Sequence, residues 1–171
     1  MKTGSKPAIA LTALLLAGCG VDPVQQDQPI YLQPGQGMMA VVMDTLDPIT
    51  HVIIEPEDSA GAKINIPSVP AGMNVYLYPV PAGSYCFTEF QYANLHFKSV
   101  KEHETCFLVK AGELGYSGNL APRVEGGRVY SHQNMYLEGF RTLMQQRYPI
   151  IAKQFLSPPP RQPRHPGRHH H

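Results

Sequence analysis

Serine, histidine and acidic side chains are the groups of this chain that could perform hydrolysis. Their spacing can be compared with that of known catalytic motifs. His103 and Glu104 begin the pattern of a zinc-protease helix, but the second histidine of that pattern would fall at Phe107. Ser117 lies at the serine position of a nucleophile elbow, but the glycine that the motif requires two residues later is Asn119. Both patterns are incomplete, so the sequence predicts no catalytic residues.

Metal-binding patterns are incomplete as well. The acidic turn at residues 55–58 could ligate calcium, but it lacks the alternating oxygen donors of a dedicated calcium loop. A cluster near the C-terminus could bind a divalent transition ion: His165, His169, His170 and His171. The other histidines stand alone: His51, His96, His103 and His132. We therefore expect a protein that is not an enzyme and has no metal and no cofactor, with a hydrolase or metal-binding enzyme as the alternative.

The first nineteen residues carry the clearest pattern in the chain. Lys2 and Lys6 precede ten mostly apolar residues at positions 8–17, too few for a membrane-spanning helix, which needs about 20. This arrangement is typical of a secretory signal. The tetrapeptide LAGC at residues 16–19 then resembles the lipobox of bacterial lipoproteins. The resemblance implies that residues 1–18 are a signal peptide and that Cys19 is lipidated.

Lipidation of Cys19 would place the mature chain at the periplasmic face of a membrane. Gly20 follows the cysteine, and the absence of aspartate there favours the outer membrane over the inner one. Without the two leader lysines, 12 basic residues stand against 13 acidic ones. This balance provides no overall field for nucleic acid. Residues 19–37 are rich in Gln, Pro and Asp, and we expect them to form a flexible tether.

Two cysteines remain if Cys19 carries lipid. Because the periplasm is oxidising, Cys86 and Cys106 are expected to form a disulfide. Closing such a loop would contribute roughly 3 kcal/mol in the chain-entropy description. Two buried reduced thiols are the alternative.

Residues 38–122 consist of short runs of strand-forming residues separated by turns. Residues 38–43 are apolar at every position, which indicates a central strand covered on both faces. About seven such runs, with almost no helical periodicity, predict an all-β, antiparallel β-sandwich.

The C-terminal part has a different pattern. Over residues 131–156, apolar side chains recur at helical spacing from Leu137 to Ile151, and Ser131 could cap the helix. Pro149 should kink or split this helix, which we expect to cover the second face of the strand at residues 38–43. Residues 157–171 are rich in Pro, Arg and His, and we expect a disordered tail.

Two motifs carry a second resemblance: VPAGSYC at residues 80–86 and CFLVKAGELGY at residues 106–116. They resemble a group of uncharacterised proteobacterial lipoproteins with a prealbumin-like or carboxypeptidase-regulatory-like sandwich. The resemblance covers about a quarter of the chain and implies a binding or scaffolding role.

The segment from residue 75 to 97 is rich in aromatic residues, most of which we expect in the core. In an alternative interpretation, Tyr76 and Tyr78 lie opposite Val75 and Leu77 and form an exposed patch for a protein or glycan partner. The sequence thus predicts a lipid-anchored binding or structural module of the bacterial envelope. An accessory lipoprotein of an envelope assembly, such as a secretion system, is the alternative within this class.

Overall fold

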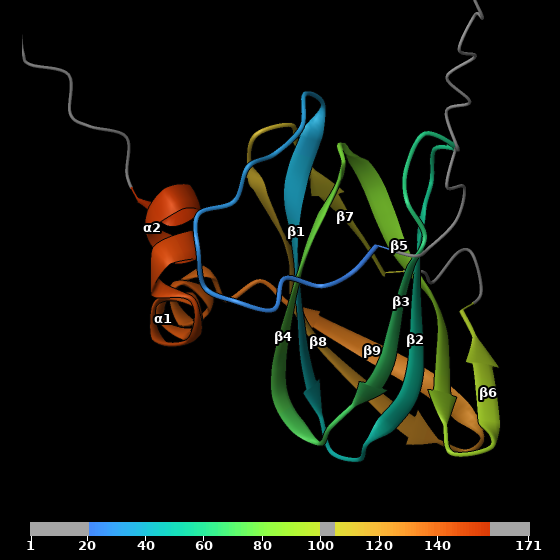
Figure 1. The fold of residues 1–171 in the computed structure, drawn as a ribbon. Coiled ribbons are helices and arrows are strands. Elements are labelled where there is room, and N and C mark those ends of the chain that lie inside the picture. The colour runs from blue at the N-terminus through green and yellow to red at the C-terminus, as the bar shows by residue number, and fades with distance from the viewer. Residues whose placement is uncertain (1–20, 100–104, 158–171) are drawn as a thin grey trace, which may run out of the picture.

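A computed structural model of the chain describes residues 21–99 and 105–157. Within them, two open β-sheets face each other as in a sandwich, and two short helices lie beside one sheet (Figure 1). The strands are β1 Gln36–Thr45, β2 Ile49–Pro56, β3 Ile64–Val69, β4 Gly72–Pro81, β5 Gly83–Tyr92, β6 Leu95–Lys98, β7 Thr105–Val109, β8 Leu114–Glu125 and β9 Arg128–Asn134. The helices are α1 Leu137–Arg147 and α2 Pro149–Leu156.

The strand order confirms a two-sheet fold and corrects its details. One sheet has the order β4-β1-β8-β9, and the other has the order β3-β2-β5-β6, with β7 also paired to β5. The described residues contain nine strands, so the prediction of about seven was wrong. The sheets are not purely antiparallel either, because β1 and β8 run parallel. Strand β9 lies beyond the predicted domain end at residue 122. It is joined to β8 at Gly126 and Gly127, whose positive φ angles form the tight turn between the two strands.

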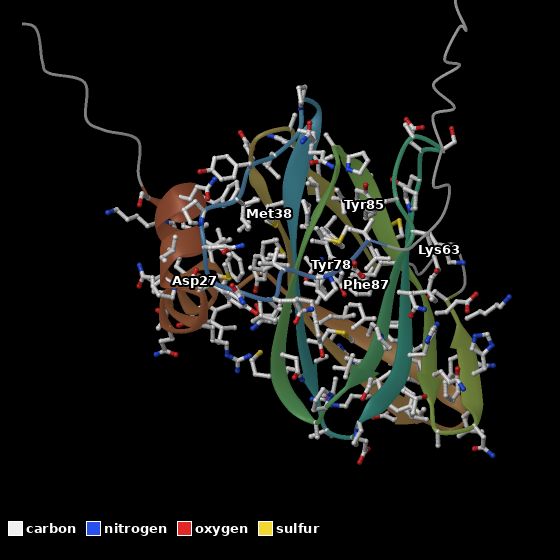
Figure 2. All side chains as sticks on the ribbon, viewed as in Figure 1. Asp27, Met38, Lys63, Tyr78, Tyr85 and Phe87 are labelled. Atoms are coloured by element: carbon white, nitrogen blue, oxygen red, sulfur yellow. A yellow bond between two sulfur atoms is a disulfide. The ribbon has the colours of Figure 1, made fainter. Side chains whose placement is uncertain are left out.

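Strand β1 is buried on both faces, as its uniformly apolar sequence predicted. Side chains alternate along a strand. Met39, Val41 and Met43 therefore point between the sheets, where they meet Tyr78, Tyr85 and Phe87 (Figure 2). Met38, Ala40 and Val42 point the other way, into a second core. The protein thus has two apolar layers that share one strand.

The helices close the second core. Phe140, Met144 and Ile151 are each at most 2% exposed and pack with Met38 and its neighbours. This confirms the expected helical cover of β1. The predicted single segment at residues 131–156 is corrected, because Ser131 belongs to β9 and the helical part begins at Leu137. Pro149 splits the helix as expected: α1 ends at Arg147, and the proline occupies the first turn of α2.

Residues 21–35, predicted as part of a flexible tether, lie against the domain instead (Figure 1). The Val24 amide donates to the Leu77 carbonyl of β4 at 2.8 Å. Ile30 and Gln154 of α2 exchange two hydrogen bonds of 2.9 and 2.8 Å. Composition predicted a polar linker, but Val24, Ile30 and Leu32 pack on the second core and hold the segment in place.

Asp27 joins this segment to the start of α2 (Figure 2). Its carboxylate accepts the amide protons of Ile150 at 2.9 Å and Ile151 at 3.0 Å, while Tyr148, the residue before the helix, makes no side-chain cap. Amides at a helix N-terminus have no partner within the helix, so a remote carboxylate can cap them. Asp27 therefore supplies from the N-terminal segment the cap that α2 lacks locally.

We predict that Asp27→Ala lowers the free energy of unfolding by about 1–2 kcal/mol, the usual value of a helix cap. Hydrogen exchange should accelerate at the amides of Ile150 and Ile151. Asp22→Ala is the matched control, since Asp22 is exposed in the same segment. Unchanged exchange at both amides in Asp27→Ala would contradict the capping role.

Candidate functional site

A bulge in β8 organises the surface beside the helices. Ala40 pairs with Tyr116 and Val42 pairs with Asn119, so β8 has one more residue than β1 over this stretch. Ser117 and Gly118 lie in the bulge, and Gly118 has a positive φ of 76°. The Ser117 hydroxyl accepts the Val42 amide proton at 3.1 Å and donates to the Gly118 carbonyl at 2.7 Å.

The hydrogen bonds of the Ser117 hydroxyl give this residue a structural role. Its side chain is 0% exposed, and its hydroxyl fills the gap that the bulge leaves in the β1–β8 ladder. The Ser117 carbonyl also accepts the side-chain amide of Gln133 at 2.7 Å. A substrate could not reach this buried hydroxyl, so the structure gives no support to the hypothesis that Ser117 is a hydrolytic nucleophile.

The bulge places Tyr116 and Asn119 next to α1. The Tyr116 ring stacks on Phe140 with ring centroids 4.1 Å apart and an interplanar angle of 7°. Its hydroxyl donates to the side-chain oxygen of Asn119. Burial raises the pKa of Tyr116, so the phenol stays protonated and remains a donor near neutral pH. Asn119 is therefore fixed in position at the base of the helix.

A cleft of about 670 Å³ lies over this point, between α1, Met73 of β4 and Asn119 of β8. Its walls include Met73, Asn119, Tyr136, Glu138, Arg141 and Gln146. Tyr136 of this lining is 55% exposed, and its two neighbours in the chain are exposed as well: Met135 at 56% and Leu137 at 57%. We refer to these three residues as the rim patch.

The close fit of Gly139 against Tyr136 shapes this rim. A Cβ atom on Gly139 would lie 2.3 Å from the Tyr136 ring, a distance that atoms do not tolerate. The absence of a side chain at Gly139 therefore leaves room for the Tyr136 ring, which lies against the first turn of α1.

The cleft suits binding better than catalysis. Its amide, hydroxyl, carboxylate and guanidinium groups can form hydrogen bonds, while Met73, Tyr136 and Leu143 offer apolar contact. Its lining holds no histidine, no cysteine and no pair of carboxylates to act as acid and base. The arrangement can recognise a partner through shape and hydrogen bonds.

The two domain cysteines form a disulfide, as predicted. Cys86 of β5 and Cys106 of β7 stand directly opposite in register and are joined through their sulfur atoms. Glu57 lies near them, and in the described part of the chain these three residues are the one group whose atoms could surround a metal ion. Because both sulfurs are bonded to each other, neither is a thiolate ligand.

The described histidines are not all solitary, which corrects one expectation. His96 Nε2 lies 2.9 Å from Glu89 Oε2 on the outside of β5 and β6, and Lys98 Nζ lies 3.8 Å from the other carboxylate oxygen. The hydrogen bond with His96 is the main cause that lowers the pKa of Glu89, and Lys98 adds to it. His51 lies in β2, and His132 is exposed in β9.

The acidic turn is held by local contacts. Glu55 forms an ion pair with Lys63 at 3.1 Å, and the Asp58 carboxylate accepts the Ala60 amide proton at 2.9 Å. These contacts are those of a solvated turn.

The predicted exposed patch at Tyr76 and Tyr78 is corrected. Tyr78 is 1% exposed and belongs to the core between the sheets, and Tyr76 is partly buried against the same core. The two tyrosines do lie opposite Val75 and Leu77, as expected, but β4 has a second sheet over one face and helices over the other. Neither face is therefore open to a partner.

Several predicted features lie outside the described residues. They are the signal peptide, Cys19, His103 and the tail from residue 158 onward, including its histidines. Among the described helices, none has the length and apolar character needed to cross a membrane.

No protein-family model, no curated protein and no solved structure matches this chain.

The cleft was not predicted from the sequence, although the sequence contains part of the pattern that indicates it. Met135 and Tyr136 are apolar residues directly before α1, which begins at Leu137, and a solvated connection at such a place is usually polar. The sequence did not identify Asn119 as a cleft residue. Its position depends on the bulge in β8, on the hydrogen bond from Tyr116 and on its pairing with Asn134 of β9.

We predict that Ser117→Ala lowers the free energy of unfolding by about 1–3 kcal/mol, because the buried Val42 amide loses its acceptor. Chemical denaturation measures this loss. Ser131→Ala is the control, since Ser131 lies in the adjacent edge strand and should change stability little. Equal stability of both variants would contradict the bridging role of Ser117.

We predict that the pair formed by Glu89 and His96 makes the stability of the fold depend on pH. The lowered pKa of Glu89 means that its interactions stabilise the fold above the ordinary glutamate pKa of 4.5, and that this stability is lost as pH falls through the lowered value. His96→Leu should raise the pKa of Glu89, which carboxyl-carbon NMR titration measures directly. His132→Leu should leave it unchanged. An unaltered Glu89 titration in His96→Leu would refute this account.

Proposed function

We propose that this chain is a lipid-anchored lipoprotein of the bacterial envelope whose β domain is a non-enzymatic binding or structural module. The LAGC sequence at residues 16–19 supports the anchor, with lipid on Cys19. The absence of aspartate after Cys19 favours the outer membrane, with the domain on its periplasmic face. The disulfide between Cys86 and Cys106 is consistent with an oxidising compartment.

The cleft beside α1 is the observation that carries the binding role. It combines hydrogen-bonding side chains with Tyr136 of the exposed rim patch, and its lining holds no histidine, no cysteine and no pair of carboxylates. Exposed aromatic and apolar residues around a concave surface are common at protein-binding sites. A protein or glycan of the envelope is the expected partner, and nucleic acid is not.

The anchor would strengthen such binding by confinement. A domain held in a thin layer at a membrane meets partners in that layer at a raised effective concentration, without any new contact. At this raised effective concentration, a modest affinity of the cleft is sufficient for the partner to be bound. On the resemblance of residues 80–120, we extend the proposal to a sandwich of the prealbumin-like or carboxypeptidase-regulatory-like kind.

Chemical crosslinking in cells that produce the full chain tests this function. The protein should float with membranes and recover an envelope partner above the level found with an unrelated lipoprotein. Leu137→Asp should reduce that recovery at least about fivefold, because a partner that covers the rim patch would have to bury an unpaired carboxylate. Aspartate is favourable in the first turn of a helix, so the variant should fold.

Two controls make the outcome specific. Leu46→Asp changes another exposed leucine, in the turn between β1 and β2, and should leave recovery unchanged. Cys19→Ser should move the protein to the soluble fraction and reduce recovery through loss of confinement. Failure to recover any partner above the unrelated lipoprotein would reject the binding role.

A further inference from the structure

The first described residues of the chain are already fixed on the sandwich. Val21 packs against the core between the sheets, as does Ala62, which lies two residues before β3. Three residues later, the Val24 amide donates to Leu77 of β4 at 2.8 Å. Figure 1 shows the segment that follows crossing β4 toward the helices. The point where the domain receives its N-terminal chain therefore lies at the β3 and β4 side.

The distance from this point to Cys19 is short. Gly20 is the single residue between Cys19 and Val21. Two residue steps of fully extended chain span about 7 Å at most. The headgroup layer on one side of a bilayer is about 5–8 Å thick. With lipid on Cys19, the chain between the acyl groups and Val21 is thus little longer than the headgroups themselves.

We propose that the β3 and β4 side of the sandwich lies on the phospholipid headgroups of the membrane. This inference rests on the proposed function, because it requires lipid on Cys19. Strand β3 is the outer strand of one sheet and β4 is the outer strand of the other. Both edges therefore face the layer in which the anchor is held, and the domain lies close to the bilayer with one side toward it.

The side chains of this surface fit a headgroup layer. Asn65, Ser68, Gln25 and Gln26 are exposed and uncharged, and their amides and hydroxyl can bond to phosphate and ester oxygens. Lys63 is paired with Glu55, and Asp22 of the N-terminal segment is exposed, so the described residues of this side present no cluster of free positive charge. Within the described residues, none of the large exposed apolar side chains belongs to β3 or β4. The surface is suited to rest on lipid without inserting into it.

The opposite side of the domain points away from the bilayer. In the first sheet, β9 lies three strand positions from β4, a separation of about 14 Å at the usual spacing. Tyr130 of β9 is 47% exposed. A probe at this position should lie well beyond the headgroups, whereas a probe on β3 should lie among them.

Tryptophan fluorescence can measure this orientation, because the chain contains no tryptophan. The full lipidated chain carrying Asn65→Trp or Tyr130→Trp would be purified from membranes and reconstituted into phosphatidylcholine vesicles. Some lipids would carry a nitroxide quencher on the headgroup. We expect quenching at residue 65 to exceed that at residue 130 at least about threefold, because contact quenching is limited to the headgroup layer.

Further variants secure the result. Gln25→Trp provides a second probe on the same side, should Asn65→Trp fail to fold, and should be quenched like it. A ten-residue Gly/Ser insertion between Gly20 and Val21 should abolish the difference between the two sides. Equal quenching at residues 65 and 130 in protein that floats with the vesicles would overturn the orientation. Protein that carries no lipid and does not float would instead overturn the proposed function.

Discussion

The complete burial of β1 is the constraint on which the rest of the structure depends. A strand that is apolar on both faces requires a cover on each, and one opposing sheet supplies only the first. The second cover comes from Phe140, Met144 and Ile151 of the helices. These short helices would be marginal by themselves, since isolated helices of this length gain little from local hydrogen bonds. Packing on β1 stabilises them, and they in turn exclude water from its outer face.

The same constraint explains why the N-terminal segment is ordered against the domain. The helices leave part of the second core to be filled by Val24, Ile30 and Leu32. Once these side chains are in place, Asp27 and the backbone of Ile30 can bond to α2. The two ends of the described chain therefore meet on one layer. The cleft forms where α1, which follows β9 in the chain, packs beside the bulge of β8.

Sequence patterns predicted the parts that depend on local periodicity, and missed those that depend on contacts between distant residues. The run at residues 38–43 and the spacing from Leu137 to Ile151 predicted both the central strand and its helical cover. The Gly126-Gly127 turn, a hairpin signal, was overlooked because Ser131 suggested a helix start. Tyr78 looked like half of an exposed patch because alternation alone cannot show that both faces of β4 are covered. The cleft combines elements that are far apart in the chain, so no single stretch of sequence could predict it.

The cross-strand link between Cys86 and Cys106 has a consequence for the integrity of the polypeptide. The two residues are 20 positions apart and bracket β6 together with the chain that leads into β7. A protease that hydrolyses one peptide bond between them does not separate the pieces, because sulfur still connects β5 to β7. The nicked molecule would gain only the mass of the one water that hydrolysis adds and would keep both strands of its β5–β7 ladder. A reducing agent would then be needed to release the two pieces from each other.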